Sequence, residues 1–263
     1  MRRQARRAAL ALAVACGALA VWSVAAGGQT QASPPAPTAA TGSPAGPARA
    51  ALLARGRDLY AGTCTVCHGE DLRGVRGQGP SLRGKGAAAA DFYLSTGRMP
   101  IADPTDEPTR ATPQYSRRDI AALVAYVGSF GGPPIPTADP ARGDVARGKE
   151  AFTESCAGCH QVMARGGIVT GAFAPSLQDV SPREIAEAVR IGPYLMPVFG
   201  TRRLSPRDVD DIAAYVLSTR HPDDRGGWGI GNIGPVPEGM ITWLLAAVVL
   251  LGIARALGER APS

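Results

Sequence analysis

Two copies of the motif Cys-x-x-Cys-His, at residues 64–68 and 156–160, constrain this 263-residue chain more than any other feature. The motif is typical of covalent haem attachment, in which both cysteines form thioethers to the porphyrin and the histidine ligates the iron. A disulfide or a redox dithiol does not need the trailing histidine, and a zinc site would need a second pair of ligands close by. The sequence therefore predicts two covalently bound haem c groups. The predicted attachment and ligand residues are Cys64, Cys67 and His68 in the first motif and Cys156, Cys159 and His160 in the second.

The length and the charge distribution limit the remaining possibilities. Without its flanking segments the chain leaves two units of about 80 residues, near the lower limit for an independent core, and a haem would complete each core. The formal net charge of +6 comes largely from four arginines among the first seven residues. The basic excess therefore does not lie on a folded surface, and we expect no nucleic-acid partner. No paired carboxylates, Ser/His/Asp set or phosphate-binding glycine loop indicates substrate chemistry on this chain.

Both ends of the chain carry apolar segments. Residues 8–26 run without a charge behind the N-terminal arginines, a pattern typical both of a cleaved signal peptide and of a retained membrane anchor, and residues 1–28 are assigned to one of the two. Residues 239–258 are predicted to form a transmembrane helix followed by a cytoplasmic tail at 259–263, the alternative being a buried helix of a soluble domain. The arginines of this end favour the cytoplasm, which places the folded middle on the extracytoplasmic face of the cell membrane.

Breaks rich in proline and glycine divide the middle of the chain into two domains that align as a repeat. In each domain a glycine and an aromatic residue precede the haem motif, Pro-Ser-Leu and then Met-Pro follow it, and a helix that begins at a serine closes the unit. The predicted boundaries are a Pro/Ala-rich tether at 29–49, the first domain at 50–130, a linker at 131–143, the second domain at 144–220 and a Gly-rich linker at 221–238.

The methionines supply candidates for the second axial ligand of each iron. Of the five, Met1 begins the chain, Met240 lies in the apolar C-terminal segment, and Met163 is too close to its histidine to reach the opposite haem face. Met99 and Met196 remain, at matching places in the two domains, each followed by proline. A thioether opposite a histidine raises the reduction potential of haem iron and closes the iron to substrates. We therefore predict Met99 and Met196 as axial ligands of two electron-transferring centres.

The order of these features resembles class I cytochrome c. The segment 79–84, Gly-Pro-Ser-Leu-Arg-Gly, is similar to the loop in which that family's proline carbonyl contacts the second nitrogen of the haem histidine. In the second domain Ala174 replaces the loop glycine, which weakens the implication for Pro175. The resemblance also implies that the first helix packs on an aromatic residue of the last, here Tyr126 or Tyr215. The expected fold is mainly α: tandem class I cytochrome c domains with one C-terminal transmembrane helix, and a second at the N-terminus if the leader is retained.

The sequence around Met99 and Met196, and the Gly-rich run 226–239 ahead of the apolar helix, resemble the dihaem cytochrome c subunit of the actinobacterial cytochrome bc complex. The resemblance implies an electron-transfer subunit of a quinol–cytochrome c reductase, with cytochrome b and a Rieske iron–sulfur protein as partners and a terminal oxidase as acceptor. It further implies that the first haem accepts electrons from the Rieske centre and the second delivers them to oxidase copper. The alternatives are the cytochrome subunit of a periplasmic dehydrogenase or of a cbb-type oxidase, and a soluble dihaem carrier.

Overall fold

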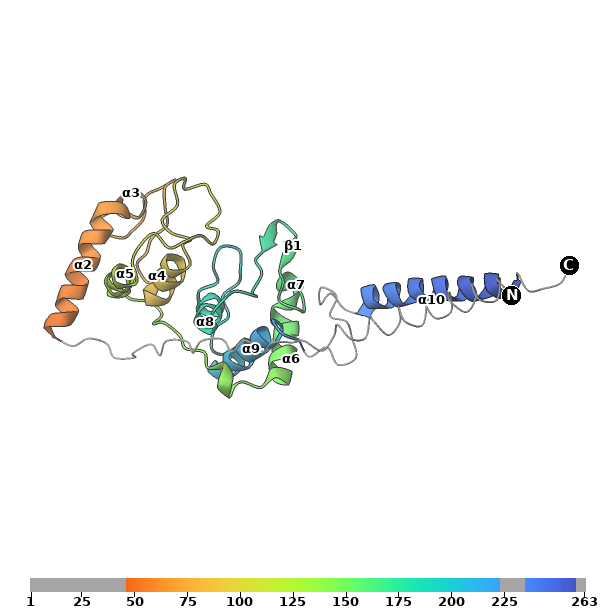
Figure 1. Ribbon diagram of the computed structural model, residues 1–263. Coiled ribbons are helices and arrows are strands. Elements are labelled where there is room, and N and C mark those ends of the chain that lie inside the picture. The colour runs from red at the N-terminus through yellow and green to blue at the C-terminus, as the bar shows by residue number, and fades with distance from the viewer. Residues whose placement is uncertain (1–45, 223–234, 259–263) are drawn as a thin grey trace. The chain divides into compact units, whose positions relative to one another are not determined.

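The computed structural model describes residues 46–222 and 235–258, and the predicted leader, most of the tether and the cytoplasmic tail lie outside these residues (Figure 1). Helices make up most of the described chain. The first half contains α2 (Pro47–Thr63), α3 (Thr65–His68), α4 (Gly86–Ser95) and α5 (Arg117–Gly128). The second half contains η1 (Pro140–Arg142), α6 (Val145–Ser155), α7 (Ala157–His160), α8 (Pro182–Ile191), α9 (Pro206–Ser218) and α10 (Pro235–Gly258). A two-stranded antiparallel hairpin, β1 (Gly167–Val169) with β2 (Ala172–Ala174), pairs Ile168 with Phe173.

Each domain is built on a contact between its first and last long helices, α2 with α5 and α6 with α9. The crossing is close because glycine stands at it: a Cβ added to Gly56 or to Gly148 would collide with a backbone carbonyl of the last helix. One turn further on, Tyr60 meets Tyr126 with ring centroids 5.4 Å apart. Phe152 meets Tyr215 at 5.3 Å in the second domain. The predicted packing of the first helix on the last is confirmed in both domains.

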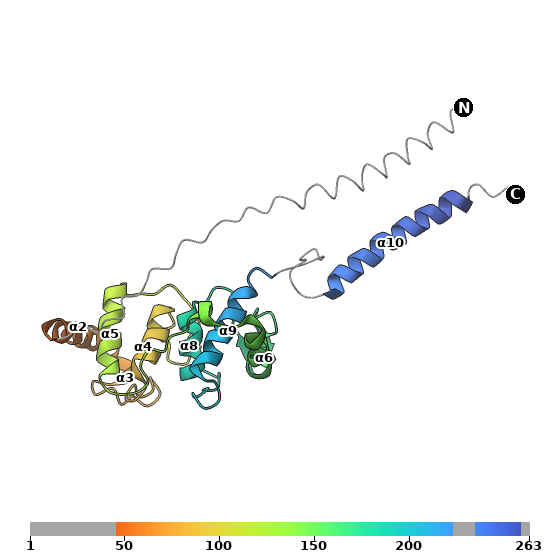
Figure 2. The ribbon, with the colours of Figure 1, turned by 90° about the horizontal axis from the view of Figure 1, so that it is seen from below.

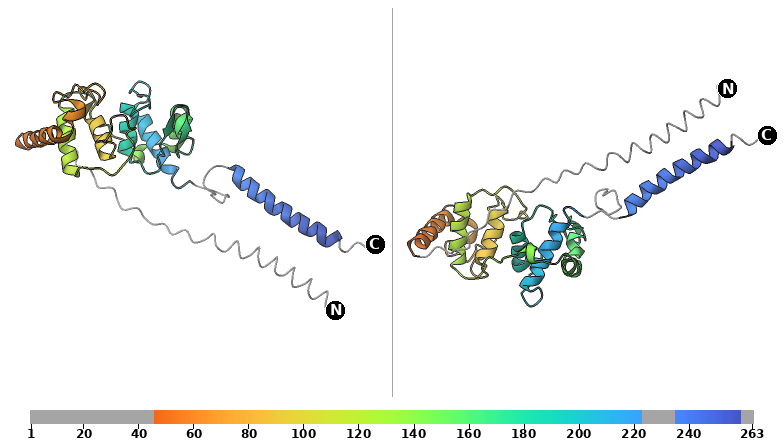
Figure 3. Two further views of the ribbon diagram at one scale, coloured as in Figure 1. Left: turned by 90° about the horizontal axis from the view of Figure 1, so that it is seen from above. Right: turned by 60° about the horizontal axis from the view of Figure 1, so that its bottom comes forward.

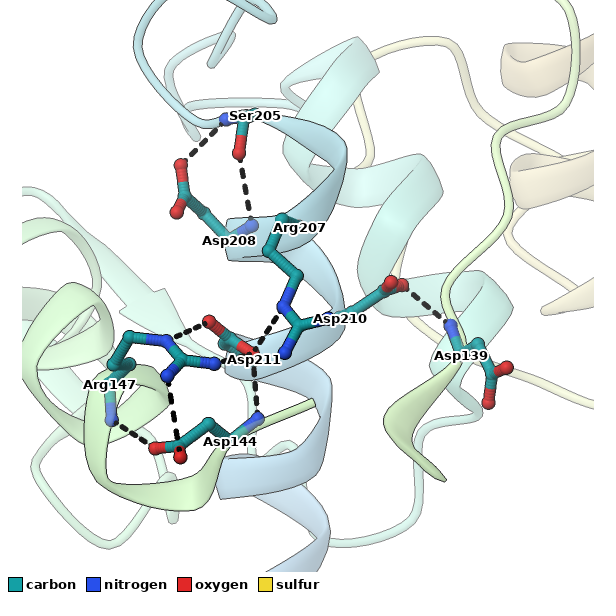
Figure 4. A network of polar contacts seen from close by, with 8 residues as sticks. All are labelled: Asp139, Asp144, Arg147, Ser205, Arg207, Asp208, Asp210 and Asp211. Atoms are coloured by element: carbon teal, nitrogen blue, oxygen red, sulfur yellow. Dashed lines mark hydrogen bonds and ion pairs between the residues drawn. The ribbon is translucent and has the colours of Figure 1, made fainter. Parts of the chain in front are cut away.

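Serine begins both closing helices, as the sequence predicts. The Oγ of Ser116 accepts the N–H of Asp119 at 3.2 Å, and the Oγ of Ser205 accepts the N–H of Asp208 at the same distance. The carboxylate of Asp208 in turn accepts the N–H of Ser205 at 2.7 Å, so the second helix starts with a reciprocal capping box (Figure 4). These caps fix where α5 and α9 start, and therefore which of their faces is buried.

A buried carboxylate joins α6 to α9 (Figure 4). Asp211 accepts the backbone N–H of Asp144 at 2.6 Å and the Nε–H of Arg147 at 2.9 Å, and Arg207 lies 3.4 Å away. Asp144 itself caps α6, since its side chain accepts the N–H of Arg147 at 2.9 Å. Because the second haem motif directly follows α6, this network helps to hold the motif in place.

The two domains have separate hydrophobic cores. In the first, Tyr60, Leu72, Leu123 and Val127 are buried together, with Cys64 half-buried against them. The second core is larger, and it includes residues of α6, α8 and α9 with Cys156 and Met196 half-buried at its edge. Both cores therefore reach the haem motif of their own domain.

The domains meet along α4 and α8, which lie side by side (Figure 2). Arg183 of α8 pairs with Asp91 of α4, with 2.7 Å between Nη2 and Oδ2. The hydroxyl of Tyr93 accepts the backbone N–H of Tyr194 at 3.3 Å. The repeat is thus joined by polar contacts as well as by the linker.

Helix α10 is the one described helix that is long and apolar enough to cross a membrane, with a mean hydropathy of 2.2 over its most apolar 18 residues (Figure 3). It begins at Pro235, so the last four residues of the predicted linker are helical. Proline suits this first turn, because its fixed φ matches a helix and its missing N–H would have no partner there. The predicted C-terminal transmembrane helix is therefore present and longer than expected.

Candidate haem-binding sites

The two Cys-x-x-Cys-His motifs have the same local structure. In each, the first cysteine ends the preceding helix and the second cysteine and the histidine lie on one further turn, α3 or α7. The N–H of Cys64 donates to the carbonyl of Tyr60 at 2.9 Å, and that of Cys156 donates to Phe152 at 2.8 Å. Cysteines three residues apart on such a turn share a face. This is the arrangement that attachment to one flat porphyrin requires.

The histidines are held by proline carbonyls. Nδ1 of His68 lies 2.8 Å from the carbonyl oxygen of Pro80, and Nδ1 of His160 lies 3.0 Å from that of Pro175. Because a carbonyl only accepts, Nδ1 carries the proton and Nε2 keeps the lone pair that a metal needs. Burial lowers the pKa of His160, which favours the neutral imidazole. The carbonyl contact is thus present in both domains, including the second, where the sequence implied it less strongly.

The second domain keeps this contact because the extra residues between its histidine and its proline form a hairpin that projects from the loop. The N–H of Gly166 donates to the carbonyl of His160 at 3.0 Å, as the N–H of Gly74 donates to His68 at 2.8 Å in the first domain. Strands β1 and β2 then rise from the loop and return the chain to Pro175. The replacement of glycine by Ala174 is therefore accommodated.

The predicted residues of the second domain line one cavity of about 300 Å³. Cys156, Cys159, His160 and Met196 all border it, and apolar side chains of α6, α8 and α9 form much of its wall. Burial raises the pKa of Cys156 to about 11, so its thiol stays protonated at neutral pH. A paired thiol set, an oriented imidazole, a thioether and apolar walls fit a covalently attached haem.

In the first domain the motif has the same backbone, and burial raises the pKa of Cys64 to about 11. Met99 follows α4, with its N–H bonded to the carbonyl of Tyr93 at 3.0 Å, and Met196 is held similarly by the carbonyl of Pro193 at 3.0 Å. That Met99 faces His68 across a haem stays a prediction.

Comparison with known proteins identifies the family. Residues 53–130 match the sequence model described as Cytochrome c, and residues 143–216 match that described as Cytochrome C oxidase, cbb3-type, subunit III. The chain is 39% identical over 231 residues to the cytochrome bc1 complex cytochrome c subunit of Corynebacterium diphtheriae, covering 80% of this chain and 82% of the relative. The chain belongs to the family of cytochrome bc1 complex cytochrome c subunits. The Mycobacterium tuberculosis H37Rv subunit is 38% identical over 220 residues, covering 80% and 79%.

The sequence resemblance to the cytochrome c subunit of a bc complex is thereby confirmed, and the fold agrees with tandem cytochrome c domains. The chain is also similar to a protein of the alternative class, the cytochrome subunits of cbb-type oxidases. It is 30% identical over 189 residues to the cbb3-type cytochrome c oxidase subunit CcoP of Azospirillum. That match covers 62% of this chain and 61% of the relative, less than the bc1 subunits cover. In this family, cytochrome c domains imply covalently bound haem c.

The bc1-type subunit has one feature that its sequence did not reveal: the first domain forms part of the cavity of the second. Phe92, Tyr93 and Arg98 border it, as do residues 107–110 of the loop after Met99. No signal in a single sequence ties these positions to the other domain, because their nearest motif is that of the first haem.

The interface also contains a buried pair of carboxyl groups, Asp91 and Glu187, beside Arg183. Burial, and then the hydrogen bond to Asp91, raise the pKa of Glu187 to about 9. Glu187 is therefore protonated at neutral pH and donates to Asp91, and Arg183 balances the one remaining negative charge.

Proposed function

We propose that this chain is a membrane-anchored dihaem cytochrome c that passes electrons from the Rieske iron–sulfur protein of a quinol–cytochrome c reductase to a terminal oxidase. The observation that carries the proposal is the cavity of the second domain. There, two cysteines, a histidine fixed by Pro175 and the thioether of Met196 border one apolar space. Membership of the bc1 subunit family supports the respiratory role, with cytochrome b and the Rieske protein as neighbours.

Each domain is proposed to bind one haem c. Cys64 and Cys67 would attach the first, and His68 and Met99 would ligate its iron. Cys156, Cys159, His160 and Met196 serve the second in the same way. When bound, haem iron supplies one-electron chemistry by alternating between its ferric and ferrous states. The similar helical turns of the two motifs support the same role for both.

The protein's own groups prepare the site for electron transfer without substrate binding. The carbonyl of Pro175 holds the proton on Nδ1 of His160, so that Nε2 is free to act as a ligand. The thioether of Met196 would ligate the iron and so exclude oxygen or another small molecule. Apolar walls exclude water and favour the iron state of lower charge, which raises the reduction potential.

Helix α10 is proposed to anchor these domains on the extracytoplasmic face of the membrane. Arg255 in its last turn favours the cytoplasmic side, by the positive-inside rule. Covalent haem attachment outside the cytoplasm agrees with this orientation. Anchoring keeps the domains close to a membrane complex, and the chain can then serve as the electron-transfer subunit of the reductase.

The test is purification of the full chain in mild detergent through a tag at its C-terminus. We expect two covalently retained haems per polypeptide by the pyridine haemochrome assay, together with co-purified cytochrome b and Rieske protein. Met196→Ala should keep both haems attached but lower the potential of one of them, whereas Met163→Ala should leave both potentials unchanged. A haem count other than two, or recovery of the chain without those partners, would contradict the proposal; recovery with a cbb-type oxidase would support the alternative.

A further inference from the structure

The side chain of Arg98 belongs to the first domain but borders the cavity of the second. The residue is 9% exposed, and its guanidinium carbon lies 4.7 Å from the centroid of the Phe92 ring. Its Nη1 has no hydrogen-bond partner among the residues that the structure describes. A buried guanidinium normally has its N–H groups paired, because leaving a charged donor unpaired away from water is costly. The unpaired nitrogen therefore indicates a missing partner.

The nearest carboxylate does not supply that partner. Oε1 of Glu184 lies 3.8 Å from Nη1 of Arg98, beyond hydrogen-bond distance. The same Oε1 is already bonded to Nη2 of Arg110. Glu184 is itself 8% exposed, so one buried carboxylate faces two guanidinium groups. Glu184 therefore pairs with Arg110 and leaves Nη1 of Arg98 without a hydrogen bond.

The other carboxyl groups near this wall do not pair with Arg98 either. Glu107 borders the cavity, but it is exposed and makes no ion pair or hydrogen bond with Arg98. Asp91 pairs with Arg183 at 2.7 Å, and the buried carboxyl of Glu187 shares a hydrogen bond with Asp91. With Glu187 protonated, this group of three carries no net charge. Among the described residues, no carboxylate therefore lies within hydrogen-bond distance of Nη1 of Arg98, and this nitrogen can bind an anionic group in the cavity.

The chemistry of the cavity specifies the anion. Its wall is otherwise largely apolar, as a porphyrin requires, and the charged substituents of haem c are its two propionate carboxylates. Building on the haem site proposed above, we propose that Arg98 binds a propionate of the haem in the second domain. The planar guanidinium can bind a carboxylate through two parallel hydrogen bonds, which gives such pairs their strength and geometry. The second haem site would then be completed by the first domain.

The position of Arg98 gives this contact a further consequence. It directly precedes Met99, the proposed ligand of the first haem, whose N–H bonds to the carbonyl of Tyr93. The Tyr93 hydroxyl contacts the backbone of Tyr194, close to Met196. The segments that carry Met99 and Met196 are therefore in contact through Tyr93 and Tyr194. The positive charge of Arg98 stabilises the reduced state of the second centre.

The experiment is a spectroelectrochemical titration of the haem-loaded full chain in detergent. Arg98→Gln is expected to lower the ferrous-to-ferric ratio of the second haem by about three- to tenfold at a fixed ambient potential, where tenfold corresponds to about 59 mV for one electron. Arg98→Lys keeps the positive charge but loses the planar guanidinium, and it should lower this ratio less. Arg202→Gln removes an exposed cation from the second domain and is the matched control. The component that changes in Met196→Ala identifies the second haem.

The outcomes separate this inference from the function on which it rests. If each variant retains two haems, the proposed haem sites are supported whatever the potentials are. A second-haem potential equal to that of the parent in Arg98→Gln, an equal shift in Arg202→Gln, or a shift confined to the first haem overturns the role of Arg98. If Arg98→Gln does not assemble, Glu184→Gln replaces it. Removing that competing carboxylate should raise the potential of the second haem, and an unchanged potential overturns the inference.

Discussion

Replacement of Asp211 by alanine tests how firmly α6 is held to α9. The carboxylate is 2% exposed and accepts hydrogen bonds from the N–H of Asp144 and from Arg147. Leaving the Asp144 N–H unpaired costs about 1–3 kcal/mol. Arg147 is half-exposed, so solvent screening keeps the contribution of its ion pair small. Asp211→Ala should therefore lower the free energy of unfolding of the second domain by about 1–3 kcal/mol.

The measurement is urea unfolding of the full chain in detergent, followed by far-ultraviolet circular dichroism. For a slope of about 2 kcal/mol/M, the midpoint of the second domain should fall by about 0.5–1.5 M. Asp210→Ala is the matched control on the adjacent position. Asp210 accepts a single hydrogen bond, from the N–H of Asp139 at 2.7 Å, so its loss should cost no more than about 1 kcal/mol.

The difference in the free energy of unfolding between the parent and Asp211→Ala also depends on pH. Burial raises the pKa of Asp211, but the hydrogen bonds from Arg147 and Asp144 outweigh it, and the folded-state pKa lies below its ordinary value. The contribution of the carboxylate is therefore present above its unfolded-state pKa, and it is lost as the pH falls through the lower folded-state value. Equal midpoints for Asp211→Ala and Asp210→Ala at neutral pH, or a difference that grows in acid, would refute this account.

Three further changes have defined outcomes. Gly148→Ala should destabilise the second domain, because the new Cβ collides with the carbonyl of Asp211, whereas Gly62→Ala meets open space in α2 and should be neutral or stabilising in the same urea titration. Glu187 has a folded-state pKa of about 9, above its unfolded value, so its contribution is complete in acid and is lost as the pH rises towards 9. Urea midpoints measured across that range should accordingly fall less steeply for Glu187→Gln than for the parent. Truncation after residue 222 removes α10 and should release the haem domains from the membrane fraction, as immunoblotting of separated fractions would show.

The repeat and its helices could be predicted from sequence because their signals are local. Ser116 and Ser205 mark helix starts by bonding an N–H three residues on, and the glycine–aromatic spacing of the first helix reports its packing. The proline contact of His160 was harder to predict, because a hairpin inserted in the loop changes the spacing without moving the carbonyl. Arg98 could not be predicted at all, since its role depends on how two separately encoded domains meet. Contacts between domains leave no periodic pattern in a single chain.

The hairpin of the second domain makes this loop tolerant of changes in length. Strands β1 and β2 project from the chain between His160 and Pro175, and the Ile168 side chain near their tip is 91% exposed. The loop is closed at its base by hydrogen bonds, so extra residues accumulate at the tip and the imidazole stays where it was. A short peptide could be grafted there, for example one that adheres to an electrode or carries a fluorophore. The second centre could then exchange electrons with an electrode, or be followed by fluorescence, through a group a few residues away that does not disturb its ligands.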